Sequence, residues 1–223
     1  TETLNISSTT NLRVRSYSDQ KLPSPITSNS YFINEDSLTL PVISISTNDA
    51  YLTDSMIGIY VEGANGKIDN CIDSAMNFNQ DWERAVNLEY FLPSGEQVIN
   101  QVVGVKINGG CSRNVPSKSF AVYAREKYGI SRMHYPLFPN KDIAEYKNVI
   151  LRNAGNDYYY AYMRDGFMQT LIAGVTDIDY QSYQPVRIYI NGDYWGILNM
   201  REKQNEHYLA YNHGVDPDRK STR

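Results

Sequence analysis

Residues 102–124, VVGVKINGGCSRNVPSKSFAVYA, decide the fold, because they predict two strands joined by a loop. The loop carries the residues of chemical interest: Gly109, Gly110, Ser112, Arg113 and, at the entrance to the second strand, Lys118. Glycines let a backbone adopt positive φ and approach a ligand closely. Loop N–H groups, a hydroxyl and two cations can together hold a phosphate. The alternative is a plain hairpin, since the loop matches neither common glycine-rich phosphate motif.

The composition indicates a soluble globular protein with a core, because 41% of the 223 residues are hydrophobic and 21% are charged. A net charge of −4 argues against a nucleic-acid partner, which usually meets a basic face. No apolar run approaches the ~18 residues of a membrane span. The 19 tyrosines suit strands that are partly exposed to solvent. Such a composition is common in secreted and envelope proteins, so we expect the protein to be secreted or in the cell envelope.

Cysteine and histidine do not form a metal-ligand pattern. Cys71 and Cys111 are compatible with one disulfide or with two buried thiols. His134, His207 and His213 are scattered along the chain. A metalloenzyme built on these residues is therefore not indicated.

The N-terminal segment predicts short strands at 12–17 and 30–33, separated by a proline turn at 21–25. So few residues cannot bury a β-sandwich core alone. We therefore expect residues 1–34 to be the last strands of an upstream β-sandwich, residues 35–40 a linker, and residues 41–223 the main domain. The alternative is an arm that packs on the main domain.

The main domain predicts mostly strands: 41–46, 57–61, 85–91, the pair at 102–124, 146–151 and a hairpin at 185–200 turned by Asn191-Gly192. Polar residues 62–80 predict a long solvated loop. Apolar residues at four-residue steps predict an amphipathic helix over 159–173 that Gly174 ends, and a second helix is expected at 203–212.

Several blocks of this chain, in order, resemble the spore-coat protein H (CotH) kinase family. They include DWERAVNLEYFLPSGE at 81–96, GVKINGGCSRNVPSKSFAVYAREKYG at 104–129, LRNAGNDY at 151–158, MRDGFMQTLIAG at 163–174 and YQPVRIYINGDYWGILNMREK at 183–203. The N-terminal segment resembles the end of the small C-terminal β domain of chitobiase and β-hexosaminidase enzymes.

The resemblance implies an α+β fold, a protein-kinase-like N-lobe of antiparallel strands with a few helices. It also implies an atypical bacterial protein kinase that transfers the γ-phosphoryl of ATP to Ser or Thr, for which the protein supplies positioning and charge neutralisation. Lys118 is then the expected phosphate-contacting catalytic lysine, and Asp165 the second expected catalytic residue. Either Arg164 or Asp165, on the helix that corresponds to the kinase αC, would orient Lys118 or a phosphate. The other implied contacts with the nucleotide are Gly109, Gly110, Ser112, Arg113, Arg152, Asn156, Arg164 and, at the hinge, Glu202.

The same resemblance places the catalytic and Mg²⁺-binding aspartates after Arg223, so we expect no metal ligands within this chain and no turnover by it alone. The expected partner is a protein with a Ser or Thr acceptor. A second interpretation is a non-catalytic secreted or cell-surface protein with protein or glycan contacts. A glycoside-processing module would need a pair of carboxylates in a cleft, and no such pair stands out.

Overall fold

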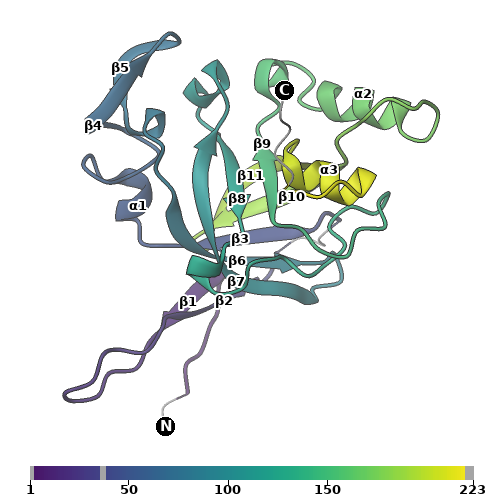
Figure 1. Ribbon diagram of the computed structural model, residues 1–223. Coiled ribbons are helices and arrows are strands. Elements are labelled where there is room, and N and C mark those ends of the chain that lie inside the picture. The colour runs from purple at the N-terminus through teal and green to yellow at the C-terminus, as the bar shows by residue number, and fades with distance from the viewer. Residues whose placement is uncertain (1–2, 36–38, 219–223) are drawn as a thin grey trace.

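The computed structural model describes residues 3–35 and 39–218, and its main body is a closed β-barrel (Figure 1). Its seven strands are β3 (Val42–Ser46), β6 (Arg84–Phe91), β7 (Gln97–Asn108), β8 (Ser119–Tyr123), β9 (Asn148–Arg152), β10 (Tyr183–Ile190) and β11 (Asp193–Glu202). Around the barrel they run β10-β11-β9-β8-β7-β6-β3. Strand β3 closes the ring, because it pairs antiparallel with β6 and parallel with β10.

Strand β7 shows why these residues form a barrel. Every second residue from Ile99 to Ile107 is buried, so one face of the strand lies in the interior, and Gly104 on the other face is buried as well. Strand β3 is buried at all five positions, which fits its run of β-branched and small residues. The core is therefore built by strands from both the N-terminal and the C-terminal parts of the chain.

Two strand pairs agree with the sequence. The predicted pair at 102–124 is β7 and β8, and the predicted hairpin at 185–200 is β10 and β11. Between β10 and β11, Asn191 and Gly192 both have positive φ, 52° and 95°. Such values are what a tight two-residue hairpin requires, and they explain why Asn-Gly predicts this turn well.

The expected α+β, protein-kinase-like N-lobe is wrong. The fold is mostly β, and the described residues contain three short α-helices: α1 (Ala50–Thr53), α2 (Arg164–Ile172) and α3 (Glu206–His213). The expected helix at 159–173 begins only at Arg164, after Tyr162 adopts a positive φ of 63°. Its expected core residues Phe167 and Leu171 are 51% and 52% exposed. Closure of the sheet, not a packed helix, encloses the core.

The expected loop at 62–80 is also wrong. It forms a two-stranded sheet of β4 (Glu62–Asp69) and β5 (Ile72–Met76), followed by the 3₁₀ turn η1 (Asn77–Asn79), whereas 57–61 is not a strand. The fully buried Asn77 fixes this hairpin by donating to the carbonyls of Ser55 and Gly58 at 3.0 and 2.9 Å. A polar, glycine-containing strand has little intrinsic β signal, so tertiary contacts decide its structure.

The N-terminal segment forms a projecting hairpin of β1 (Thr10–Val14) and β2 (Thr27–Tyr31) (Figure 1). It is tied to the barrel by Ser30, whose N–H and hydroxyl donate to the Glu89 carboxylate at 2.9 and 2.6 Å. Arg13 adds a hydrogen bond from Nη1 to the Thr47 carbonyl at 2.7 Å. Its assignment to an upstream domain stays a prediction, and part of the expected linker, 36–38, lies outside the described residues.

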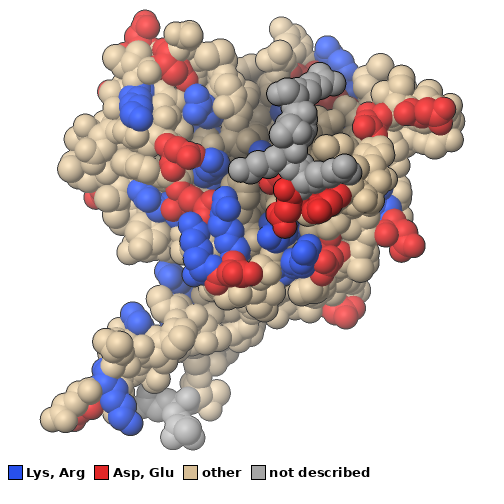
Figure 2. Space-filling model, viewed as in Figure 1, with Lys and Arg blue, Asp and Glu red and all other residues tan. Residues whose placement is uncertain are grey.

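The surface view shows Lys and Arg mixed with Asp and Glu on the visible face of the barrel (Figure 2). Charge of one sign is not segregated there. Within the residues that the structure describes, no helix is long and apolar enough to cross a membrane.

Candidate functional site

The glycine loop between β7 and β8 is anchored on one side to the β4–β5 hairpin. Cys111, in the 3₁₀ turn η2 (Cys111–Asn114), forms a disulfide with Cys71, with the two Cα atoms 5.1 Å apart. The guanidinium of Arg113 adds an ion pair with Asp69 at 2.8 Å. Of the two states that the sequence allowed for the cysteines, the structure has the disulfide. It ties the glycine loop to the turn between β4 and β5.

Glycine is required at position 109. Its φ is 122°, and a Cβ there would lie 2.6 Å from the hydroxyl oxygen of Ser112. The backbone and the Ser112 hydroxyl can therefore lie side by side only because this residue has no side chain.

The buried Asn153 anchors the other side of the loop. Its amide nitrogen donates to the carbonyls of Ser112 and Ser117, both at 2.9 Å, and its backbone N–H donates to the Ser119 hydroxyl at 2.9 Å. Its amide oxygen accepts from the backbone N–H of Gly155 at 3.1 Å. Asn153 thus joins the glycine loop to the loop that follows β9.

The loop after β9 has an unusual backbone. Ala154 and Gly155 are consecutive left-handed residues, with φ of 67° and 61°. A Cβ on Gly155 would lie 2.8 Å from an Nη atom of Arg152, so glycine leaves room for that guanidinium. The 3₁₀ turn η4 (Gly155–Asp157) then carries the chain toward α2.

Asp157 organises the entrance to α2. Its carboxylate accepts from the backbone N–H groups of Ala161 and Arg164, at 3.3 and 3.0 Å. It also pairs with the side chain of Arg164, Nε to Oδ1, at 3.2 Å. Asp157 is buried, whereas the Arg164 side chain is 63% exposed. The pair therefore fixes the stem of Arg164 and leaves much of its guanidinium accessible.

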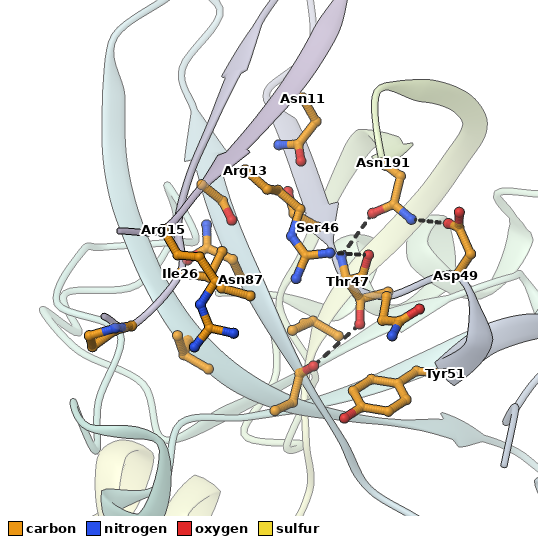
Figure 3. A pocket seen from close by; sticks show the side chains of 16 residues that line it. Asn11, Arg13, Arg15, Ile26, Ser46, Thr47, Asp49, Tyr51, Asn87 and Asn191 are labelled. Atoms are coloured by element: carbon orange, nitrogen blue, oxygen red, sulfur yellow. Dashed lines mark hydrogen bonds between the residues drawn. The ribbon is translucent and has the colours of Figure 1, made fainter. Parts of the chain in front are cut away.

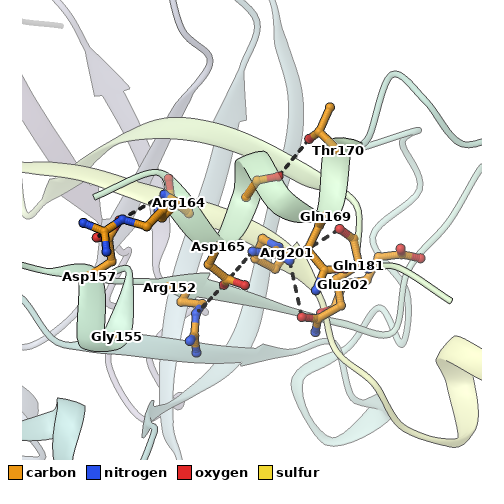
Figure 4. A network of polar contacts seen from close by, with 12 residues as sticks. Arg152, Gly155, Asp157, Arg164, Asp165, Gln169, Thr170, Gln181, Arg201 and Glu202 are labelled. Atoms are coloured by element: carbon orange, nitrogen blue, oxygen red, sulfur yellow. Dashed lines mark hydrogen bonds and ion pairs between the residues drawn. The ribbon is translucent and has the colours of Figure 1, made fainter. Parts of the chain in front are cut away.

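Asp165 lies between two arginines (Figure 4). Its Oδ2 is 3.0 Å from Nε of Arg152 and 2.8 Å from Nη1 of Arg201. Arg201 is 1% exposed, and burial lowers the pKa of its guanidinium. Two cations share one carboxylate, so the cluster keeps a net positive charge, and Arg152 is its more exposed cation.

These segments surround an open pocket of 650 Å³. Seven of the ten predicted site residues line it: Gly109, Gly110 and Ser112 from the glycine loop, Arg152 and Asn156 after β9, and Arg164 and Asp165 on α2. Partly exposed guanidinium groups beside a glycine-containing backbone suit an anionic ligand with several oxygen atoms, such as a chain of phosphates.

Lys118 lies below the loop and does not line the pocket. It is 6% exposed, and its ammonium donates to the carbonyls of Arg113 and Val115 at 2.6 and 3.2 Å. The ammonium also lies over the rings of Tyr60 and Phe78, 5.2 and 4.8 Å from their centroids. Burial lowers its pKa. The carboxylate of Asp165 is instead paired with arginines, so the structure does not bring Lys118 and Asp165 together.

Arg113 and Glu202 also lie outside the pocket lining. Arg113 is engaged with Asp69, and it donates to the Phe78 carbonyl at 3.1 Å. Glu202 is buried, and its carboxylate accepts from the Ser182 N–H at 2.9 Å and from the Asn212 amide at 3.0 Å. In this structure both residues hold the fold around the pocket.

Sequence reasoning did not select Asp157 and Tyr160, which also line the pocket. Asp157 precedes Arg164 by seven residues, and no known spacing predicts that pair. The one sequence feature that points to these two residues is a polar loop directly after a buried strand. Among the described residues, no group of three or more His, Cys, Asp or Glu side chains could hold a metal ion.

The comparison with protein families adds one match. Residues 105–222 match the family described as CotH kinase protein, which is slightly more than half of the 223 residues. The match includes every residue that lines the 650 Å³ pocket. No curated protein matches the chain. The resemblance of the N-terminal segment to a chitobiase-type domain lies outside this match and stays a prediction.

Proposed function

This chain belongs to the CotH kinase protein family, and we propose that its glycine-loop pocket binds the phosphates of ATP for phosphoryl transfer to a Ser or Thr of a protein. One observation carries the proposal. Seven residues selected from the sequence, six as nucleotide contacts and Asp165 as a catalytic residue, come from three separate segments and line the same pocket. A hairpin loop that only turned the chain would not need residues from three separate segments to meet in one pocket.

The chemistry of the pocket fits that role. Phosphoryl transfer needs positioning and neutralisation of charge more than covalent participation by the protein. Arg152 and Arg164 supply planar donors for phosphate oxygens, and the glycines let the backbone approach them. Asp157 and Asp165 orient these arginines through ion pairs of 3.2 and 3.0 Å. We infer that both aspartates act by positioning.

In the proposed function, Lys118 supports the glycine loop. Its contact with phosphate, which the family resemblance implies, would require the ammonium to leave the carbonyls of Arg113 and Val115. The residues that the structure describes supply no set of three metal ligands, so no step is assigned to Mg²⁺ here. A location outside the cell or in its envelope stays part of the proposal.

The test is calorimetric titration of the chain with Mg·ATP and, separately, with adenosine. We expect saturable binding of Mg·ATP, and at least tenfold weaker binding by Arg164→Gln and Arg152→Gln. Adenosine affinity should not change in these variants, because the guanidinium groups contact only phosphates. Arg125→Gln is the matched control: this arginine pairs with Glu83 at 3.0 Å and lies outside the pocket.

Two results would overturn the proposal. The first is absence of Mg·ATP binding by folded wild-type protein, which would favour a non-catalytic secreted or surface protein. The second is unchanged Mg·ATP affinity in both pocket variants, which would place the nucleotide elsewhere.

A further inference from the structure

A second pocket, of 730 Å³, lies between the N-terminal hairpin and one rim of the barrel (Figure 3). Strand β1 forms one wall, the segment after β3 and the β10–β11 turn form the opposite wall, and β3, β6 and β7 contribute the floor. Its volume falls within the roughly 300–1,000 Å³ of small-molecule sites. It shares no lining residue with the phosphate pocket.

One wall presents two arginines without carboxylate partners. Alternation along an extended strand places Asn11, Arg13 and Arg15 on the same face, and all three line the pocket. Arg13 is anchored through one nitrogen on the Thr47 carbonyl, and Arg15 through Nε and Nη2 on the Ser24 carbonyl at 3.2 and 3.0 Å. Among residues 3–35 and 39–218, neither forms an ion pair with Asp or Glu.

The anchors leave other guanidinium N–H groups available on both side chains. A guanidinium held by one edge presents its remaining donors as a planar fork, which matches the two oxygens of a carboxylate. The only acidic residue in the lining is Asp49, which already accepts from the Asn191 amide. The pocket therefore carries a net positive charge on a chain whose net charge is −4.

The floor and the β1 wall add polar atoms with unused hydrogen-bonding capacity. Ser46, Asn87 and Val102 form one row across β3, β6 and β7. The hydroxyl of Ser46, a residue 1% exposed, and the amide oxygen of Asn11 are buried without a partner among the described residues. Both atoms belong to residues that line the pocket, so a ligand hydroxyl or a water there can satisfy them.

Amides and hydroxyls both donate and accept, as the hydroxyl groups of a sugar require. Apolar surface lies beside them, because Ile26 and the ring of Tyr51 also line the pocket. A small inorganic anion would use the arginines but neither the amides nor the apolar surface. A neutral sugar would leave the arginines unpaired.

We propose that this pocket binds an acidic oligosaccharide, with a sugar carboxylate on Arg13 and Arg15 and sugar hydroxyls on Asn11, Ser46 and Asn87. The site is separate from the nucleotide pocket, so it does not depend on the proposed kinase function.

The test is titration of the chain with short oligomers of galacturonate, guluronate and hyaluronan, and with a neutral galactose oligomer and sodium sulfate. We expect saturable binding of at least one acidic oligomer, and at least tenfold weaker binding of the neutral oligomer and of sulfate. Arg15→Gln and Asn87→Ala should each weaken binding of the acidic oligomer at least tenfold. Arg15 is preferred to Arg13, because Arg13 also ties the hairpin to Thr47.

Lys21→Gln is the matched control, since it removes one positive charge from the same hairpin at a position outside the pocket. The affinity of this variant for the acidic oligomer should equal that of wild type. A melting curve and Mg·ATP titration for each variant separate loss of this site from loss of the fold or of the nucleotide pocket.

Several outcomes would overturn the proposal. One is failure of all three acidic oligomers to bind folded protein. Another is equal affinity for sulfate, which would indicate a simple anion site. Unchanged affinity in both pocket variants, or displacement of the oligosaccharide by excess Mg·ATP, would place the ligand elsewhere.

Discussion

The ammonium of Lys118 donates to the backbone carbonyl of Arg113 at 2.6 Å, and Arg113 lies in the loop that the family resemblance predicts to bind phosphate. This lysine closes the base of the loop, and its ammonium also donates to the Val115 carbonyl at 3.2 Å. The loop's shape and its nucleotide affinity should therefore depend on one buried charge.

Lys118→Met should lower the free energy of unfolding by about 2 kcal/mol, because two carbonyls lose a charged donor at a buried site. Urea denaturation measures the change. Mg·ATP affinity should fall in parallel, since the loop loosens. Lys67→Met, at an exposed position on β4, is the control and should leave both quantities unchanged. A Lys118→Met variant with wild-type stability would show that the lysine does not support the loop.

Loss of the disulfide should destabilise the protein. The cysteines are separated by 40 residues, and closing a loop of that length corresponds to about 4 kcal/mol of unfolding free energy in the chain-entropy account. Reductant should lower the melting temperature of wild type but not that of Cys71→Ser/Cys111→Ser. Two reactive thiols in the unreduced, unfolded chain would contradict the pairing.

Asn153→Ala should cost about 2–3 kcal/mol of stability, because two carbonyls and one buried N–H lose the partner that this fully buried side chain supplies. Amide hydrogen exchange should accelerate across residues 109–118. The exposed neighbour Asn156 is the matched control, and Asn156→Ala should change stability by less than about 0.5 kcal/mol. Unchanged exchange in Asn153→Ala would mean that the two pocket loops are held by other contacts.

Stability should fall at acid pH through His207. Burial lowers the pKa of its imidazole below the ordinary value of 6.5, opposed by Glu206 and assisted by Lys147 and Arg132. The folded state therefore binds the proton more weakly than the unfolded state does. This contribution is complete above pH 6.5 and is lost as the pH falls through the folded-state pKa.

Urea titrations between about pH 5 and 8 measure this effect. His207→Gln should reduce the slope of stability against pH, by well under the ~1.4 kcal/mol of a full pKa unit, because the side chain is only partly buried. His134→Gln is the control, at a side chain that is 63% exposed. An identical slope in wild type and His207→Gln would contradict this assignment.

Local sequence signals predicted individual strands well. Sequence patterns located β6, the β7–β8 pair and β9, and Asn191-Gly192 located the β10–β11 turn. The helix expected at 203–212 corresponds to α3 within a few residues. These elements are set by residues close together in the chain, so periodicity and turn chemistry suffice.

Longer-range features could not be predicted in this way. The apolar steps over 159–173 indicated a core helix, yet Phe167 and Leu171 are half-exposed, and the small Gly166 lies against Tyr183 instead. The polar β4–β5 hairpin depends on Asn77 and the disulfide. Within the candidate site, the residue types were predictable, but their partners were not.

The sequence by itself determined most strands of the barrel, the β10–β11 turn and the residue types able to contact phosphate, because those depend on side-chain alternation, φ preferences and chemical type. The tertiary structure alone decided that the sheet closes into a barrel, since β3 must pair with β10 across more than a hundred residues. It also decided that Asp165 pairs with Arg152 and Arg201, and that Lys118 turns to loop carbonyls. Each of these depends on which distant groups become buried together, and burial is a property of the whole packed chain.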